Sequence, residues 1–600
     1  MGKAFASLAA RADWRPPSLL INHPAPFTLT VMIRKFVFGL ALILSGFSFA
    51  VAASKPNLVL ITIDSARADR MGFLGAKGSF SPNLDRFSSD AIIFEHAYAQ
   101  APGTVVSHAT ILSGAYPQST GMSEIGGTLP ASLLYLPDLL KAQSYRTAAF
   151  VGSIDLDPQN GLAQGFNRGF QTYDAGFRPM IPGDPRPPLT ERSGAQVVTR
   201  AIAWLDQNTS SPSPFFLWIN LSDPAAPSAS YTSAITAADT ALGKVVAALQ
   251  QRKLYASTAI VVVADHGESL GAHGEESHGI FLYDETIHVP LLVKLPEGQA
   301  AAKPATRVAA KVRLVDIAPT LLEIASIPVP SQMPGQSLLR AAKTGTGTDQ
   351  PAYSRSDLPQ RGFGWSPLES WRASKYLYIR APKPELYDLT ADPLAAHNLA
   401  QTSKGIVDTM ASQLDSFDRR FSGETAKGSA ELNSAEMQKL ASLGYIGIQK
   451  SAGATTAVAG TDPKDKIATA SKVIEAASSR GQSKPERAIA TLDPIVAADP
   501  NLYLAQYALG QALARKGQYA DSAKHLHKAI ELQPDSAWAH YEIGAALLKT
   551  GDYKTAVIHL EIATGRLPGF SETHTALAEA YEHTGRSDDA KKEKVKAGDK

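Results

Sequence analysis

Three polar positions in the sequence have the residue types needed to bind a divalent cation. Asp64 directly follows one apolar run, and Asp265 and His266 directly follow another. Taken singly, an aspartate at the end of a strand is more often a helix cap than a ligand. Together, two carboxylates and an imidazole suit zinc or manganese, with calcium as a third candidate. We therefore expect one metal site formed by Asp64, Asp265 and His266.

Thr104 stands where a loop leads into a short predicted helix. A threonine at such a position is ordinarily a helix cap that takes no part in a reaction. A threonine hydroxyl is nearly inert at neutral pH, but a bound divalent cation favours its alkoxide, and helix amides can receive an anionic oxygen. Thr104 is therefore also a candidate nucleophile and a candidate metal ligand.

The elements that must position these residues are short, mostly apolar runs separated by longer amphipathic stretches. The runs comprise residues 58–63, 92–94, 147–151, 215–220, 259–264 and 289–294. Continuous apolar runs of this length are typical of strands buried on both faces, which predicts an α/β fold with a mostly parallel sheet between helices. Asp223 also follows one of these strands, so it is a further candidate ligand, although a turn role explains it equally well.

The composition excludes several classes of protein. The chain has 600 residues, no cysteine and a formal net charge of only +2. Disulfide-stapled miniproteins, thiolate metal sites and thiol catalysis are therefore excluded. The basic residues are spread along the chain, so we do not expect nucleic acid as a partner.

The first 52 residues have the pattern of a leader and signal peptide. A basic stretch at residues 34–35 precedes an apolar run at residues 36–49, and Ala50-Val51-Ala52 supplies a small-x-small cleavage pattern. Met32 is a candidate for the true start. We expect an exported, periplasmic protein; the alternative is an uncleaved membrane anchor, which the short apolar run disfavours.

The C-terminal part of the chain repeats with a period of 34 residues. Gly510 recurs at Gly544, and Pro500 recurs at Pro534 and again at Pro568. This pattern resembles tetratricopeptide repeats, which are stacked helix pairs, and predicts an all-α solenoid over residues 466–598 after a linker at residues 448–465. Such repeats can bind a protein or peptide partner, or they can simply stabilise the first domain.

The motifs between residues 53 and 447 occur in an order that resembles the sulfatase family of the alkaline phosphatase superfamily. The resemblance rests on the stretches at residues 60–70, 81–85, 102–114, 264–268, 314–321 and 385–399. It implies an alkaline phosphatase-like catalytic domain that is a metal-dependent enzyme. It leaves the substrate open.

The sequence departs from the family where sulfatases carry the motif Cys-x-Pro-Ser-Arg. Here Thr104 replaces the cysteine that becomes formylglycine, and His108 replaces the arginine. Threonine cannot form that aldehyde. Ser153 replaces a sulfate-binding lysine, while His278 falls where sulfatases place a leaving-group lysine, which makes His278 a candidate general acid. A solvated loop histidine is the alternative for His278.

Threonine nucleophiles occur in the nucleotide phosphodiesterases and phosphoethanolamine transferases of the superfamily. The resemblance therefore implies a metal-dependent hydrolase or group transferase that cleaves phosphate mono- or diesters, with catalytic residues Thr104, His108 and His278. A small-molecule, glycan or lipid ester is the expected substrate. A second metal is uncertain, because Asp223 is not followed by the histidine found in relatives. The alternatives are a sulfate ester hydrolase without formylglycine and an inactive scaffold.

Overall fold

The computed structural model describes most of the chain beyond residue 54. The described residues are 55–78, 80–159, 162–177, 192–208, 211–223, 231–299, 303, 305–421, 432–443, 445, 460–478 and 482–598. The predicted leader, residues 1–52, lies outside this part. Among the described helices, none has the length and apolar character needed to span a bilayer.

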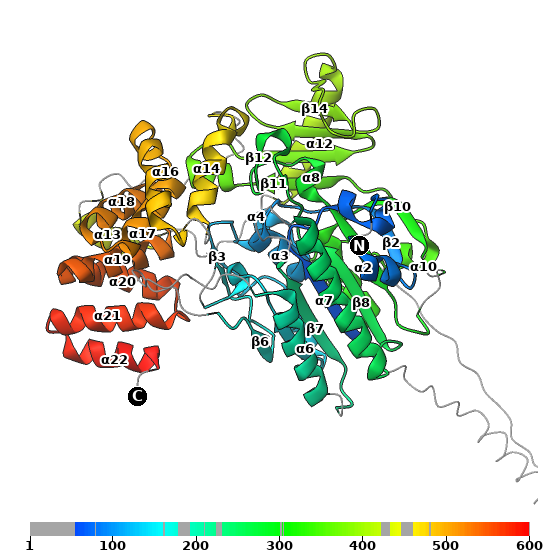
Figure 1. Cartoon of the computed structure of the whole chain (residues 1–600), viewed down its shortest axis with the longest axis horizontal. Helices are drawn as coiled ribbons and strands as arrows, with labels where there is room; N and C mark the ends of the chain where they lie inside the picture. Colours follow the sequence, from blue (N-terminus) through cyan, green and yellow to red (C-terminus); the bar gives the residue numbers. More distant parts are fainter. Residues whose placement is uncertain are drawn as a thin grey trace, which may run out of the picture. The chain divides into compact units, whose positions relative to one another are not determined.

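A central eight-stranded sheet forms the core of the first domain (Figure 1). Across the sheet, the strands run in the order β10 (Arg307–Arg313), β2 (Ile92–Tyr98), β9 (His288–Lys294), β8 (Thr258–Ala264), β1 (Asn57–Ile63), β7 (Phe215–Leu221), β4 (Arg146–Phe150) and β6 (Thr172–Asp174). Both neighbours of β9 pair with it antiparallel, and the other pairs are parallel. The predicted α/β fold with a mostly parallel sheet is confirmed.

Two groups of helices cover this sheet. The first contains α2 (Pro82–Ser88), α6 (Gly194–Asn208) and α7 (Tyr231–Gln251). Helix α7 contacts both α2 and α6, and α6 also packs on β4 and β7. The second contains α3 (Thr104–Ser113), α5 (Leu136–Ala142) and α9 (Ile317–Ile324), which likewise contact one another. The central strands β7 and β8 are buried along their whole length, as their continuous apolar runs predict.

A second, antiparallel sheet follows in the chain. Its strands are β11 (Ala352–Ser356), β12 (Leu368–Ala373), β13 (Tyr376–Arg380) and β14 (Glu385–Asp388). Helix α12 (Lys404–Phe421) packs against β12 and β13. Tyr353, Trp371 and Phe417 contribute to the apolar cluster between this helix and the sheet.

The predicted repeats form consecutive helices, and each helix packs on the next. They are α14 (Ile467–Ala477), α16 (Pro485–Ala498), α17 (Tyr503–Arg515), α18 (Tyr519–Leu532), α19 (Ala537–Thr550), α20 (Tyr553–Arg566), α21 (Ser571–His583) and α22 (Ser587–Ala597). The all-α C-terminal part predicted from the 34-residue period is confirmed.

The repeats pack directly against the first domain. Helix α11 (Leu358–Phe363) contacts α17, and Arg361 forms an ion pair of 3.1 Å with Asp535. Val473 and Leu509 belong to the same apolar core as the central sheet. Of the predicted linker, residues 448–459 lie outside the described residues. The described end of the linker is attached to the first domain, since Lys464 pairs with Glu385 of β14 at 2.7 Å.

The repeated glycines allow the two helices of a repeat to approach closely. A Cβ atom on Gly544 in α19 would lie 2.6 Å from Cγ of Leu560 in α20, closer than any real contact. We expect Gly544→Ala to lower the free energy of unfolding by about 1–3 kcal/mol, because overpacking forces the helices apart. Gly565→Ala is the control. A Cβ atom on this exposed helical glycine would meet no neighbouring residue within 4 Å, so alanine there should raise the free energy of unfolding by about 0.5–1 kcal/mol. Thermal and urea unfolding measure the stability of both variants. Equal changes in the two would contradict the close approach of the helices at Gly544.

Candidate active site

The carboxyl ends of β1 and β8 bring the predicted metal-binding residues together. In the parallel register Ile63 is opposite Ala264, so Asp64 and Asp265 leave the sheet side by side. His266 follows directly, and its side chain, like those of both aspartates, is buried. The structure thus brings these three residues together at one edge of the sheet.

Thr104 lies at the same place, as the first residue of α3. The N-cap position belongs to Gly103 and not to Thr104, so the hydroxyl is not used as a helix cap. Thr104 Oγ1 lies 3.2 Å from His266 Nε2. The hydroxyl therefore faces the predicted metal ligands.

Two aspartates and His266 converge at this point, and one carboxylate oxygen among them has no hydrogen bond. His266 Nδ1 lies 2.8 Å from the carbonyl of Gly267 and must carry the proton there, which leaves Nε2 as an acceptor for the Thr104 hydroxyl. Nε2 also lies 3.4 Å from Asp265 Oδ2, which accepts no hydrogen bond from any residue that the structure describes. Burial raises the pKa of Asp265 and, together with the charge of Asp265, that of Asp64. A buried carboxylate oxygen without a donor, beside a second carboxylate and an imidazole, is what a divalent cation stabilises, so these residues fit the predicted ion.

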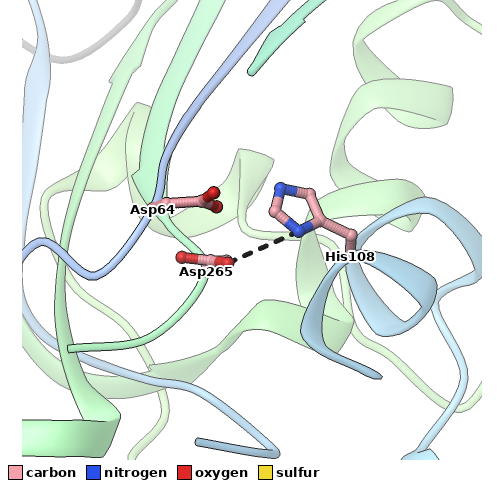
Figure 2. Close-up of side chains that lie close together, drawn as sticks. All are labelled: Asp64, His108 and Asp265. Atoms are coloured by element: carbon pink, nitrogen blue, oxygen red, sulfur yellow. Dashed lines mark ion pairs between the residues drawn. The ribbon is translucent and has the colours of Figure 1, made fainter. Parts of the chain in front are cut away.

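Asp64, His108 and Asp265 form a candidate metal-binding cluster (Figure 2). One ligand atom from each residue lies within 4.8 Å of those of the others, and all three side chains are buried. His108 Nδ1 is 3.5 Å from Asp265 Oδ2. The structure thus places the imidazole of His108 beside both aspartates. The sequence analysis assigned His108 to the reaction and not to the metal.

The hydrogen bonds of His108 show how its ring is used. Thr62 Oγ1 accepts from Trp218 Nε1 and Asn220 Nδ2, so its own proton points to His108 Nε2, 2.9 Å away. His108 Nδ1 then carries the proton and donates to the carbonyl of Thr104 at 2.8 Å. Burial lowers the pKa of His108 to about 4, so the ring is neutral. Both nitrogens are engaged within the protein, and His108 holds the first turn of α3 instead of supplying the positive charge of the family's arginine.

The carboxylate of Asp223 is used at the start of helix α6. Both of its carboxylate oxygens accept from the N–H of Gly194, at 3.0 and 2.9 Å, at the start of α6. A Cβ atom on Gly194 would lie only 2.4 Å from Asp223 Oδ2. This contact corrects the sequence-based assignment of Asp223 to the metal: its carboxylate anchors a helix.

His278 reaches the site from the loop after β8. Its ring centroid is 4.3 Å from that of His266, and its Nδ1 lies 3.0 Å from Glu268 Oε2. Burial alone would lower the pKa of His278, but the charge of Glu268 outweighs it and raises the pKa to about 9. His278 is therefore a cation at neutral pH, as a group that receives a leaving-group oxygen requires.

Two further carboxylates surround His278. Glu124 accepts from the N–H of Val106 at 3.4 Å in the first turn of α3, and burial raises its pKa to about 7. The charge of His278 acts on both Glu124 and Asp155. Among the residues that the structure describes, several carboxylates thus surround His278, and the charge of His278 is already paired with Glu268.

The sequence analysis missed several residues of this site. Asn220 donates to Asp64 at 3.2 Å from the end of β7, and its place at the end of an apolar run is a signal that could have identified it. Glu124 and Asp155 come from connecting segments that carry no such signal. Glu268 is two residues from His266, but its pairing with His278 depends on the loop path.

Family models match most of the first domain and part of the repeats. A model described as "Sulfatase" matches residues 56–327, one described as "N-sulphoglucosamine sulphohydrolase, C-terminal" matches residues 275–420, and a "TPR repeat" model matches residues 510–551. The sulfatase family is metal-dependent, which agrees with a candidate metal site at Asp64 and Asp265.

Curated relatives include the ulvan-active sulfatase of Formosa agariphila, which is 27% identical over 60% of this chain and 80% of its own length. The arylsulfatase K of Gallus gallus is 25% identical over 58% of this chain and 79% of its own.

Solved structures share the fold. The putative sulfatase yidJ from Bacteroides fragilis has a TM-score of 0.52 at 20% identity, covering 63% of this chain and all of its own. The phosphonate monoester hydrolase of Agrobacterium radiobacter has a TM-score of 0.51 at 18% identity, covering 61% and 96%. With the motifs, the parallel sheet and the site in agreement, the chain belongs to the sulfatase family and carries tetratricopeptide repeats at its C-terminal end.

Proposed function

We propose that this sulfatase-family hydrolase is an exported, periplasmic enzyme that cleaves phosphate esters through Thr104. The observation that carries the proposal is the position of Thr104, whose hydroxyl is 3.2 Å from His266 Nε2 and is not used as a helix cap. When bound by Asp64, Asp265 and His266, a divalent cation, with zinc or manganese preferred, would supply Lewis-acid stabilisation of negative charge on oxygen.

The residues of the chain then have distinct roles. Thr104 releases its hydroxyl proton to solvent, and its Oγ1 attacks phosphorus while the bond from phosphorus to the leaving oxygen breaks. The leaving oxygen takes a proton from His278. Water or a second alcohol then releases the phosphoryl group from Thr104, which makes the enzyme a hydrolase or a transferase. The first turn of α3, which the hydrogen bond from His108 to the carbonyl of Thr104 fixes, orients Thr104 toward the attacked group.

The charges of the site favour a substrate with one negative charge. Glu124, Asp155 and Glu268 are carboxylates, and His278 is the cation that faces them. A phosphate monoester brings two negative charges at neutral pH, whereas a diester brings one. Because like charges repel strongly in a buried site, we propose a phosphodiester in preference to a monoester.

A sulfate ester is the second candidate, since it also carries one negative charge and the curated relatives named above are sulfatases, one of them active on ulvan. It would be cleaved through Thr104 without formylglycine. Glycan and lipid esters remain the substrate classes proposed for either reaction, and we propose that the repeats can also bind a protein partner.

A panel of three aryl esters tests the proposal. We expect the purified protein with added zinc, manganese or calcium to turn over bis(p-nitrophenyl) phosphate at least tenfold faster than p-nitrophenyl phosphate and p-nitrophenyl sulfate. Faster turnover of the sulfate would favour the second candidate. Faster turnover of the phosphate monoester would contradict the charge argument, and no turnover of any ester would favour an inactive scaffold.

A further inference from the structure

A short segment after the first domain lies on the surface of the repeats. Helix α13 (Ser434–Ser442), which begins with a capping box between Asn433 and Glu436, and the nearby Tyr445 pack on α18, α19 and α20 (Figure 1). Leu440 and Tyr445 are buried there. Their shared apolar cluster contains Leu526, Ile530, Ala539, Ile543 and Ile562. The segment therefore occupies an apolar seat formed by a repeat and the helix that precedes it.

Two ion pairs fix the direction of this segment. Glu436 pairs with Arg566 at 2.9 Å, and Lys439 pairs with Glu561. The charges of α13 and α20 are thus complementary at both points. Such pairs specify an orientation more than they add affinity, so the apolar contacts of Leu440 and Tyr445 provide most of the stabilisation.

A chain of neutral histidines lies beneath Tyr445. Its hydroxyl is 3.5 Å from His559 Nε2, and His559 Nδ1 is 2.9 Å from His540 Nδ1. His540 Nε2 lies 3.0 Å from the carbonyl of Pro534 and must donate to it, so His540 Nδ1 accepts. His559 Nδ1 therefore donates, and its Nε2 accepts from Tyr445. Each hydrogen bond from Tyr445 to the carbonyl of Pro534 thus has one donor and one acceptor, and both imidazole rings are neutral.

The neighbouring repeats show that this pair is unusual. One period earlier, Gln506 donates to Pro500 and lies 2.8 Å from His525. One period later, His574 is paired with Glu593. Those pairs each contain a group that can face an imidazolium. In the middle repeat, a proton added to His540 Nδ1 would point directly at the proton on His559 Nδ1.

We infer that α13 with Tyr445 is an internal ligand of the repeats, and that protonation of the His540–His559 pair beneath it releases the segment in acid. Burial lowers the pKa of His540 to about 4 and that of His559 well below its ordinary value. Folded-state pKa values below the ordinary value of 6.5 mean that the stabilisation is complete above about pH 6.5 and is lost as the pH falls toward 4.

The other charged groups facing the pair do not reverse this effect. The pKa of Glu436 is lowered overall because the interaction with Arg566 outweighs burial, and that of Glu561 is lowered by Lys439, Tyr581 and Arg586, so both carboxylates stay ionised at about pH 5. His527 stacks on Tyr445 at 4.3 Å and pairs with Glu531. Asp535 is held by Arg361. The His540–His559 pair is therefore the group whose protonation opposes docking.

Single cysteines can report the docking, because the natural chain has none. Leu440→Cys places the thiol in the seat, and Ala441→Cys places it on the exposed side of the same helix. Both are made in the full chain and labelled with a dithiodipyridine reagent that reacts in acid. We expect the ratio of the two labelling rates, buried over exposed, to rise at least fivefold and up to about 30-fold between about pH 7.5 and pH 5, as linkage predicts for one such histidine.

His540→Gln is the matched control, because the chain itself uses glutamine at this position of the preceding repeat. The amide can donate to Pro534 and still accept from a protonated His559, so the ratio should stay within threefold over the same pH range. A rise of less than fivefold in the labelling ratio of the variants that keep His540 would overturn the inference. So would an equal rise in the His540→Gln background, since acid would then act through another group.

Discussion

Replacing Thr104 by valine is expected to reduce kcat for the preferred ester by about 10³-fold or more. Valine keeps the shape of threonine but removes the hydroxyl that faces His266 at 3.2 Å. Because valine has no oxygen to form the covalent ester, neither metal nor His278 can restore the reaction. Steady-state kinetics on the aryl ester panel measures the loss, and Thr104→Ser should retain part of the activity.

Thr110→Val is the matched control for this substitution. Thr110 lies in the same helix and is also buried, and its Oγ1 has no hydrogen-bond partner among the described residues. Removing its hydroxyl should therefore change kcat by less than about twofold and leave folding intact. If Thr104→Val retains more than a tenth of the natural turnover, Thr104 is not the nucleophile.

Replacing Asp265 by asparagine is expected to abolish both turnover and metal-dependent stabilisation. Metal at about 100 times its Kd should stabilise the natural protein by about 2.7 kcal/mol, whereas Asp265→Asn should show no such rise in Tm. Without metal the variant should be the more stable of the two, because the amide relieves repulsion with Asp64 and can donate to His266 Nε2. Differential scanning calorimetry with chelator and with zinc or manganese measures both effects.

Asp223→Asn separates this prediction from a general effect of losing a carboxylate at the sheet edge. Asp223 accepts from the N–H of Gly194 and anchors α6, so the variant should keep the metal-dependent rise in Tm. A normal metal response in Asp265→Asn, or a lost response in Asp223→Asn, would contradict the proposed ligand set.

The central sheet and the residues at its edge could be predicted because both depend on local sequence. The apolar runs around Leu60 and Val262 are continuous, and a parallel register places Asp64 beside Asp265. Strand β10 was not predicted, since its sequence mixes Arg307, Lys311 and Arg313 with apolar residues. It pairs with β2 at one end of the sheet, where Arg307 is exposed and Lys311 is half-buried, while Arg313 is buried in an ion pair with Asp316.

The hydrogen bonds that decide the role of each residue could not be predicted, because they join distant parts of the chain. His108 aligns with a substrate-binding arginine, yet Thr62 and the carbonyl of Thr104 occupy both of its nitrogens. Likewise, the 34-residue period predicts the repeats but not that α13 lies on them. Those contacts depend on side-chain geometry that no sequence spacing encodes.

Acid-quench mass spectrometry during turnover of bis(p-nitrophenyl) phosphate tests the central claim most directly. The account predicts a covalent nitrophenyl phosphoryl group on the peptide that contains Thr104, formed together with one equivalent of nitrophenol and absent from Thr104→Val. Turnover at the natural rate with the label on another residue, or with no label under conditions that trap phosphothreonine esters, would contradict it.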